Sequence, residues 1–243
     1  MTRIALPFAL ICGGLASSAA ASSGYGVQPP GQFHQGEAVA RQGEHWLALR
    51  VHDDSAELVS VRTKVKRVFD ALNDAEGEAS GESVSAIGMD DATMLLRGPG
   101  LRPGAVAYAS KIPQSSEHGL PTSRLTLGRR EYRMATRCVA DRAEATVEQP
   151  AYTCTIDLIE GDRRQSLVSL AAYRESPDAR LQFASEAAPN VIFAGDLDHD
   201  GRLDLIFDTT DHYNLSRPTL FLSSAADRGM LVRAVATHAA LGC

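Results

Sequence analysis

The strongest structural signal in the sequence lies in the segment Phe193-Ala-Gly-Asp-Leu-Asp-His-Asp-Gly-Arg-Leu-Asp-Leu-Ile-Phe207. Its flanks, residues 191–193 and 203–207, are short and rich in β-branched and aromatic side chains, which predicts two strands rather than two helices. Between the flanks, aspartates alternate with other residues up to Gly201, and glycine permits a sharp turn. The segment therefore predicts a β-hairpin with a strongly acidic loop.

The aspartates of this loop have the spacing of a calcium-binding loop. Positions 1, 3, 5 and 9 of a D-x-D-x-D-G-x-x-D pattern are occupied by Asp196, Asp198, Asp200 and Asp204. The backbone carbonyl of Arg202, at position 7, can supply a further oxygen. Carboxylates packed this closely repel one another unless a cation neutralises them, and oxygen ligands without cysteine favour calcium over zinc or copper. We therefore expect these five residues to bind one calcium ion.

The loop differs from an EF-hand, because Phe207 stands at position 12, where an EF-hand has a bidentate glutamate. It resembles instead the FG-GAP/VCBS type of repeat, known from integrin-like propellers and many bacterial surface proteins. In that family an apolar strand enters a calcium loop of this spacing and a second apolar strand leaves it. The resemblance implies calcium ligation by the same five residues, 196, 198, 200, 202 (backbone) and 204. It covers one copy of the loop, whereas a propeller needs several blades. The C-terminal part of the chain also looks like uncharacterised exported bacterial proteins that carry a single such loop.

The remaining sequence predicts a mainly β fold. Strand-like segments recur about every 8–12 residues from Trp46 onwards, separated by turns rich in Gly, Pro and Asp. Residues 58–68 alternate apolar and basic side chains, as a half-buried strand does. Helical character is confined to residues 65–72 and 225–229, and each of these could instead be a strand end or a turn. We expect antiparallel sheets, arranged as a sandwich or like a propeller blade, with the calcium-loop hairpin near the C-terminus.

The N-terminus has the order of a secretory signal peptide. A short basic start is followed by apolar residues 4–15 and by small residues 16–21 with an A-x-A site. We expect cleavage after Ala21 and hence a periplasmic or secreted protein. Residues 22–44, rich in Gly, Ser, Gln and Pro, predict a flexible leader with little packing. Residues 45–243 then form one mainly β globular domain, with the calcium loop at 196–204.

The mature chain retains three cysteines, Cys138, Cys154 and Cys243. Disulfides persist in the oxidising environment that an exported chain meets. Cys138 and Cys154 lie in neighbouring strand-like segments and could pair across a hairpin. Cys243 is the odd cysteine, which can stay free, pair between chains or take one of the other two. Because no C-x-x-C pair exists, the sequence supports neither a thiol-redox motif nor a zinc site.

Composition and missing motifs narrow the function. The 243 residues carry a formal net charge of −6, which argues against a nucleic-acid partner bound through a broad basic surface. No apolar run reaches the roughly 18–20 residues of a membrane span. The sequence contains no G-x-S-x-G, no H-E-x-x-H and no phosphate-binding loop. We therefore expect an exported, non-enzymatic structural or interaction protein clamped by one calcium ion, with any protein or glycan partner left open.

Two alternatives remain at the level of sequence. The first is a periplasmic or secreted hydrolase with an acidic site near the calcium loop, where Asp208, Asp211 and Asn214 flank His212. A cleft with an exposed His or Asp of strongly shifted pKa would favour it. The second is an adhesion repeat, which predicts further copies of the loop in a longer polypeptide.

Overall fold

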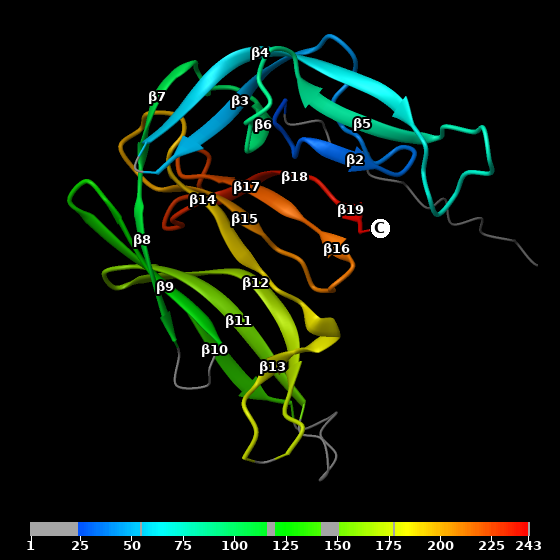
Figure 1. Ribbon diagram of the computed structural model, residues 1–243. Helices are drawn as coiled ribbons and strands as arrows, with labels where there is room; N and C mark the ends of the chain where they lie inside the picture. The colour runs from blue at the N-terminus through cyan, green and yellow to red at the C-terminus, as the bar shows by residue number, and fades with distance from the viewer. Residues whose placement is uncertain (1–23, 54, 116–119, 142–150, 177, 243) are drawn as a thin grey trace, which may run out of the picture.

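The computed structural model describes residues 24–53, 55–115, 120–141, 151–176 and 178–242 (Figure 1). These residues are almost entirely antiparallel β-structure, which confirms the predicted fold class; they include one 3-10 turn, η1 (Ala184–Glu186), and no α-helix. In this part of the chain, no helix has the length and hydrophobicity needed to cross a membrane. The expected signal peptide and Cys243 lie outside the described residues.

The larger of two main sheets has eleven strands and curls into a nearly closed barrel. Its two ends approach each other, because the first strand of the path lies against the last two. Two further strands extend the sheet from the far end of β4. The path runs through β1 (Gly26–Gln28), β6 (Met94–Arg97), β3 (His45–His52), β4 (Ser55–Val68), β7 (Gly104–Tyr108), β14 (Asn190–Asp196), β15 (Asp204–Asp208), β17 (Pro218–Leu222) and β18 (Arg233–Thr237), with β5 (Gly81–Ala86) and β2 (Gly31–Phe33) beside β4.

The second main sheet has six strands and forms a half-barrel below the first, drawn in green and yellow in Figure 1. A separate pair of two-residue strands lies near the C-terminus. The half-barrel runs in the order β13 (Gln182–Phe183), β12 (Arg163–Tyr173), β11 (Ala151–Glu160), β10 (Arg130–Ala140), β9 (Pro121–Leu127) and β8 (Ser110–Ser115), and the separate pair consists of β16 (Leu215–Ser216) and β19 (Ala240–Leu241).

The β14–β15 hairpin is buried on both faces and belongs to two hydrophobic cores. Because side chains alternate along a strand, Phe193 and Ile206 face the barrel core. Ala194 and Leu205 join the core between the barrel and the half-barrel. A strand covered on both sides needs apolar residues on both sides, which explains the continuous apolar runs that flank the acidic loop. The predicted strands at 191–193 and 203–207 therefore form the centre of the molecule.

The N-terminal segment packs more than its composition predicts. Strand β1 is buried and pairs with β6, and the side chain of Gln28 accepts hydrogen bonds from the backbone N–H groups of Val39 and Ala40. Gly26 lies so close to Trp46 that an added Cβ would lie 2.8 Å from its indole ring. The expectation of little packing at 22–44 thus differs from the structure over residues 24–44. Gly26 allows the close approach of Trp46, and Gln28 binds backbone N–H groups. A segment rich in these residue types has the same composition whether it is packed or flexible.

Neither segment with helical character forms a helix. Residues 65–68 complete strand β4, whose fourteen residues make it the longest strand among the described residues. Residues 225–229 lie in turns between β17 and β18. In both cases the pairing of neighbouring strands decides the conformation, because local propensity is a weak determinant beside tertiary context.

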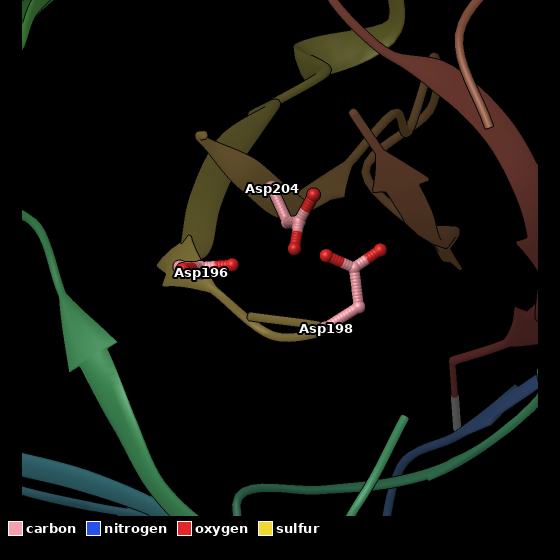
Figure 2. A group of neighbouring side chains, drawn as sticks. All are labelled: Asp196, Asp198 and Asp204. Carbon is pink, nitrogen blue, oxygen red and sulfur yellow. The ribbon is translucent and has the colours of Figure 1, made fainter. Parts of the chain in front are cut away.

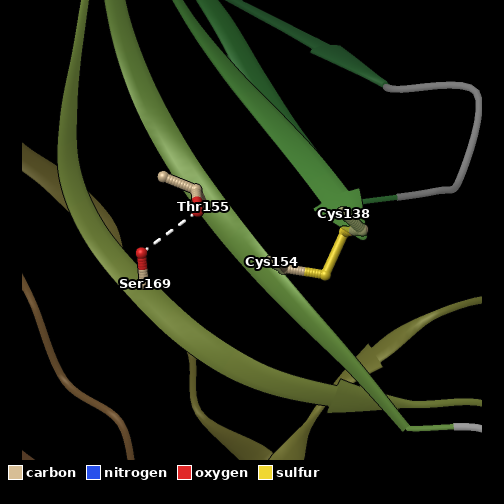
Figure 3. Close-up of a disulfide and its surroundings, with 4 residues drawn as sticks. All are labelled: Cys138, Cys154, Thr155 and Ser169. Atoms are coloured by element: carbon tan, nitrogen blue, oxygen red, sulfur yellow. Dashed lines mark hydrogen bonds between the residues drawn. A yellow bond between two sulfur atoms is a disulfide. The ribbon is translucent and has the colours of Figure 1, made fainter. Parts of the chain in front are cut away.

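Cys138 and Cys154 form the predicted disulfide (Figure 3). They stand directly opposite each other on β10 and β11, with Cα atoms 4.0 Å apart. Cys154 is fully buried in the core between the barrel and the half-barrel. On the next residue, the Thr155 hydroxyl is hydrogen-bonded to Ser169 on β12 at 3.1 Å. The cross-link therefore ties together the two central strands of this sheet.

Removing the disulfide should lower the melting temperature. The cysteines are 16 residues apart, and closing a loop of that length contributes about 3 kcal/mol in the chain-entropy model. For a chain of this size that corresponds to a loss of roughly 6–12 °C. The measurement is thermal unfolding of Cys138→Ala/Cys154→Ala against the parent, with Cys243→Ser in both. Thr155→Val serves as the control, since it removes one hydrogen bond worth about 1 kcal/mol; equal melting temperatures for the parent and the double variant would contradict the prediction.

Gly195→Ala should destabilise the fold. Strand β7 approaches β14 so closely that a Cβ on Gly195 would lie 2.5 Å from the carbonyl oxygen of Ala107 and 2.6 Å from the ring of Phe193. The added methyl group forces a backbone shift, and overpacking of this kind costs about 1–3 kcal/mol. Chemical denaturation would measure the loss. Gly161→Asn is the control, because Gly161 has open space and a φ of +56° that asparagine tolerates; equal stabilities of the two variants would refute the packing argument.

Candidate metal centre

The acidic loop joins two strands whose ends are held in fixed register. Asp196 is the last residue of β14 and Asp204 the first residue of β15, where it pairs with Gly195. Asp198 projects from the loop itself, and Figure 2 shows its carboxylate turned toward the other two. One oxygen from each of the three carboxylates lies within 4.8 Å of the others. The hairpin thus brings together three hard oxygen ligands, as a single divalent cation requires.

Asp204 is the most constrained member of the group. It is fully buried, and its Oδ2 accepts a hydrogen bond from the backbone N–H of Leu197 at 2.8 Å. Its Oδ1 accepts from the backbone N–H of Ser223 at 2.8 Å and from the Ser223 hydroxyl at 3.1 Å. Burial, together with a smaller effect of the charge of Asp198, raises the pKa of Asp204 to about 8 despite these hydrogen bonds. No basic side chain of the described residues forms an ion pair with Asp204, so a bound cation would provide the missing countercharge.

Asp198 has one carboxylate oxygen without a partner. Its Oδ2 accepts a hydrogen bond from the hydroxyl of Ser224. Its Oδ1 is buried and has no hydrogen-bond partner among the described residues. A buried carboxylate oxygen left in this state costs free energy unless a ligand satisfies it. The β6–β7 connection lies against this side of the loop, because a Cβ added to Gly100 would lie 3.7 Å from the Cβ of Asp198.

Asp196 orders the loop from its first position. Its two oxygens accept the backbone N–H groups of Asp200 and Gly201, both at 2.9 Å. The loop turns through His199 and Gly201, whose φ angles of 63° and 76° lie in the left-handed region. Glycine adopts that region freely and histidine does so less often. His199 is exposed, as its alternation with the aspartates predicts. Asp196 is buried and holds the turn that aims Asp198 at Asp204.

Asp200 and Arg202 lie beside the group of three carboxylates. The Oδ2 of Asp200 accepts two hydrogen bonds from the guanidinium of Arg202, at 2.7 and 3.0 Å, and its Oδ1 accepts the Arg202 backbone N–H at 2.8 Å. The hydroxyl of Ser223 lies 2.9 Å from both oxygens of Asp200. The structure therefore brings together Asp196, Asp198 and Asp204, whereas the carboxylate of Asp200 is paired with Arg202.

Two serines at the site were not singled out by sequence reasoning. Ser223 contacts Asp200 and Asp204, and Ser224 contacts Asp198. Both follow the fully buried strand β17, which pairs with β15 and so places its end beside the acidic loop. The only sequence signal is a pair of hydroxyl residues directly after an apolar strand. Such a signal acquires meaning only once the pairing of β15 with β17 is known.

The polar residues around His212 form a hydrogen-bonded turn. Asp208 accepts the backbone N–H groups of Thr210 and Arg217, and His212 Nδ1 accepts the backbone N–H of Asn214 at 3.1 Å. Asp211 forms a two-bond ion pair with Arg217, and the hydrogen bonds from that guanidinium lower its pKa. These hydrogen bonds engage Asp208 Oδ1, His212 Nδ1 and both oxygens of Asp211.

The comparisons with known proteins identify no relative. No protein-family model matches the chain, and neither curated proteins nor solved structures give a significant match. The resemblance to FG-GAP/VCBS repeats therefore rests on the loop residues alone. The metal centre is supported by the mutual approach of the carboxylates of Asp196, Asp198 and Asp204.

Asparagine substitutions should rank the loop aspartates by their place in the site. Asp198→Asn and Asp204→Asn should abolish stabilisation by calcium, because each removes a charge from the group of three. Asp200→Asn should weaken calcium binding less, since its carboxylate is paired with Arg202. Isothermal titration with calcium would measure the three affinities. The opposite ranking, with Asp200→Asn the most damaging, would show that the site is centred elsewhere in the loop.

Proposed function

We propose that this protein is an exported, non-enzymatic structural or interaction protein whose fold is clamped by one calcium ion in the loop 196–204. The observation that supports the proposal most directly is the buried carboxylate of Asp204. It faces Asp196 and Asp198, has no basic partner among the described residues, and has a pKa raised to about 8 by burial. A cation at this position would convert an unfavourable group of carboxylates into a cross-link.

Calcium is the cation that suits these ligands best. All side chains of the group offer carboxylate oxygens, which favour calcium, magnesium or manganese over zinc or copper. Calcium accepts flexible cages with several protein oxygens, whereas magnesium demands near-ideal octahedral geometry and keeps more of its water. Asp196, Asp198 and Asp204 would supply the first ligands. Asp200 and the carbonyl of Arg202 belong to the ligand set that the loop spacing proposes.

The place of the loop in the fold favours a structural role for the ion. The loop closes a hairpin that is buried in two cores, and Ser223 and Ser224 connect it to the end of β17. An ion there would hold β14, β15 and the β17–β18 connection together at one end of the barrel. The inaccessibility of Asp204, 0% exposed, suits an internal ligand and not a group that contacts a substrate.

Export is part of the same proposal. It rests on the order of basic, apolar and small residues at 1–21, and the Cys138–Cys154 disulfide is compatible with an oxidising compartment. Extracellular calcium modules bind their ion with dissociation constants of roughly 0.1–1 mM, which matches calcium concentrations outside cells and not inside them. A weak structural site of this kind would be filled only after export.

The proposal predicts a calcium-selective rise in thermal stability. At about 1 mM free calcium and a dissociation constant of about 0.1 mM, binding to the folded state contributes roughly 1.4 kcal/mol. In a chain of this size that raises the melting temperature by about 3–6 °C. The measurement compares the mature protein in EDTA, in calcium and in magnesium.

Asp204→Asn is the matched variant for this experiment, because it keeps the shape of the side chain and removes its charge. Its melting temperature should not respond to calcium. Elemental analysis of the protein after EDTA treatment shows whether an ion has stayed bound. An EDTA-treated protein that contains no calcium and whose melting temperature does not change when calcium is added would refute the proposal.

A further inference from the structure

His238 is buried where the two ends of the described chain meet. It follows β18, is 1% exposed, and its backbone N–H donates to the carbonyl of Pro218 at 3.0 Å. Its ring packs edge-on against Phe33 of β2, with centroids 5.0 Å apart. Neither ring nitrogen has a hydrogen-bond partner among the described residues. A buried imidazole without partners is rare and calls for a physical reason.

Glu37 connects the N-terminal turn to the C-terminal strand beside His238. Its Oε1 accepts the backbone N–H of Leu241 in β19 at 2.9 Å, and its Oε2 accepts the backbone N–H of His34 at 3.0 Å. The turn that carries Glu37 is in turn held to β5, because Glu82 accepts the backbone N–H of Gly36 at 3.1 Å. Both carboxylate oxygens of Glu37 are thus already engaged with backbone groups.

The other charged groups near this turn are also paired. His34 on the same turn contacts Asp70 through its Nδ1 at 2.7 Å, and Asn73 donates to the same carboxylate oxygen at 2.8 Å. The His34–Asp70 contact raises the pKa of His34 and lowers that of Asp70 to about 2. Among the described residues, Glu37 is the acidic residue that acts on the His238 ring, through its carbonyl and its carboxylate.

The environment of His238 favours the neutral imidazole. Burial lowers the pKa of His238, and this effect outweighs the carbonyl and the charge of Glu37, which raise it. A histidine with a lowered pKa in the folded state stabilises the fold above its unfolded pKa of about 6.5. That contribution is lost as the pH falls from about 6.5 through the lowered folded pKa. Protonation of His238 in acid therefore weakens the contact between the turn and the C-terminal strands.

We propose that His238 is an acid-sensitive latch, which holds the turn 34–40 and the strands β16 and β19 on the barrel at neutral pH and releases them on acidification. Among the described residues, the backbone carbonyl of Glu37 is the acceptor that acts on an imidazolium in this place, because the Glu37 carboxylate already binds Leu241 and His34. Opening the turn and the terminal strands gives the ring access to water. The half-barrel lies outside this region and is cross-linked by its disulfide, so it stays closed.

Hydrogen exchange followed by mass spectrometry tests the latch directly. Exchange is measured at pH 7.5 and pH 5, corrected for the intrinsic rates with unfolded protein, in EDTA and again in excess calcium so that the result does not depend on the metal site. At pH 5, peptides covering 33–42, 212–217 and 238–242 should lose protection, by up to roughly thirtyfold, the limit set by the distance between pH 5 and an unfolded pKa of about 6.5. Peptides from β11 should keep theirs.

His238→Phe removes the titrating group and keeps a flat ring against Phe33. Its protection in these regions should not fall at pH 5; in 33–42 it can rise, because the raised pKa of His34 makes the His34–Asp70 contact stronger in acid. His45→Phe is the matched control, because His45 is exposed on β3, and this variant should behave like the parent. If His238→Phe does not fold, His238→Gln replaces it. An equal loss of protection in the parent and in the His238 variant would overturn the proposal, as would full protection of the parent at pH 5.

Discussion

The fold depends on one hairpin that is buried on both faces and ends in a loop of carboxylates. β14 and β15 supply side chains to the barrel core and to the core between the barrel and the half-barrel. Such a hairpin is strongly apolar, yet its first and last loop residues, Asp196 and Asp204, are buried acids. The same two strands, which pack against both cores, therefore also carry a buried carboxylate, Asp204, whose pKa is raised to about 8.

Hydrogen bonds neutralise the site only in part. Backbone N–H groups of Leu197, Ser223, Asp200 and Gly201 point at Asp204 and Asp196, which fixes the conformation of the loop. Two features indicate that these hydrogen bonds compensate the burial of the carboxylates only in part. The pKa of Asp204 is raised, and Oδ1 of Asp198 has no partner among the described residues. A structural cation site needs carboxylates held in place whose negative charge is not fully compensated by the protein. The proposed calcium clamp follows from this uncompensated charge.

The sequence predicted the strands and the loop better than it predicted their assembly. Alternation located β4, and the apolar runs beside the aspartates located β14 and β15, because burial on one or two faces leaves a direct mark on side-chain type. The sequence allows Cys138 to pair with Cys154 and leaves other pairings with Cys243 open; the register of β10 and β11 decides it, because it places Cys138 and Cys154 opposite each other. The packing of residues 24–44 was missed, since Gly26 and Gln28 act through close approach and backbone hydrogen bonds. The roles of Ser223 and Ser224 depend on the pairing of β15 with β17, two strands that are distant in the sequence, and the Asp200–Arg202 pair depends on how the loop turns; the spacing of the aspartates encodes neither.

The most direct test of the calcium clamp is a crystal structure of the mature protein grown in calcium, with anomalous diffraction data to locate the ion. The account predicts one anomalous peak between Asp196, Asp198 and Asp204, with Asp198 Oδ1 at roughly 2.3–2.6 Å from it, the usual calcium–oxygen distance. The other ligands would show whether Asp200 turns away from Arg202 to join the cage. An ordered loop without a peak, or a peak elsewhere in the molecule, would contradict the account.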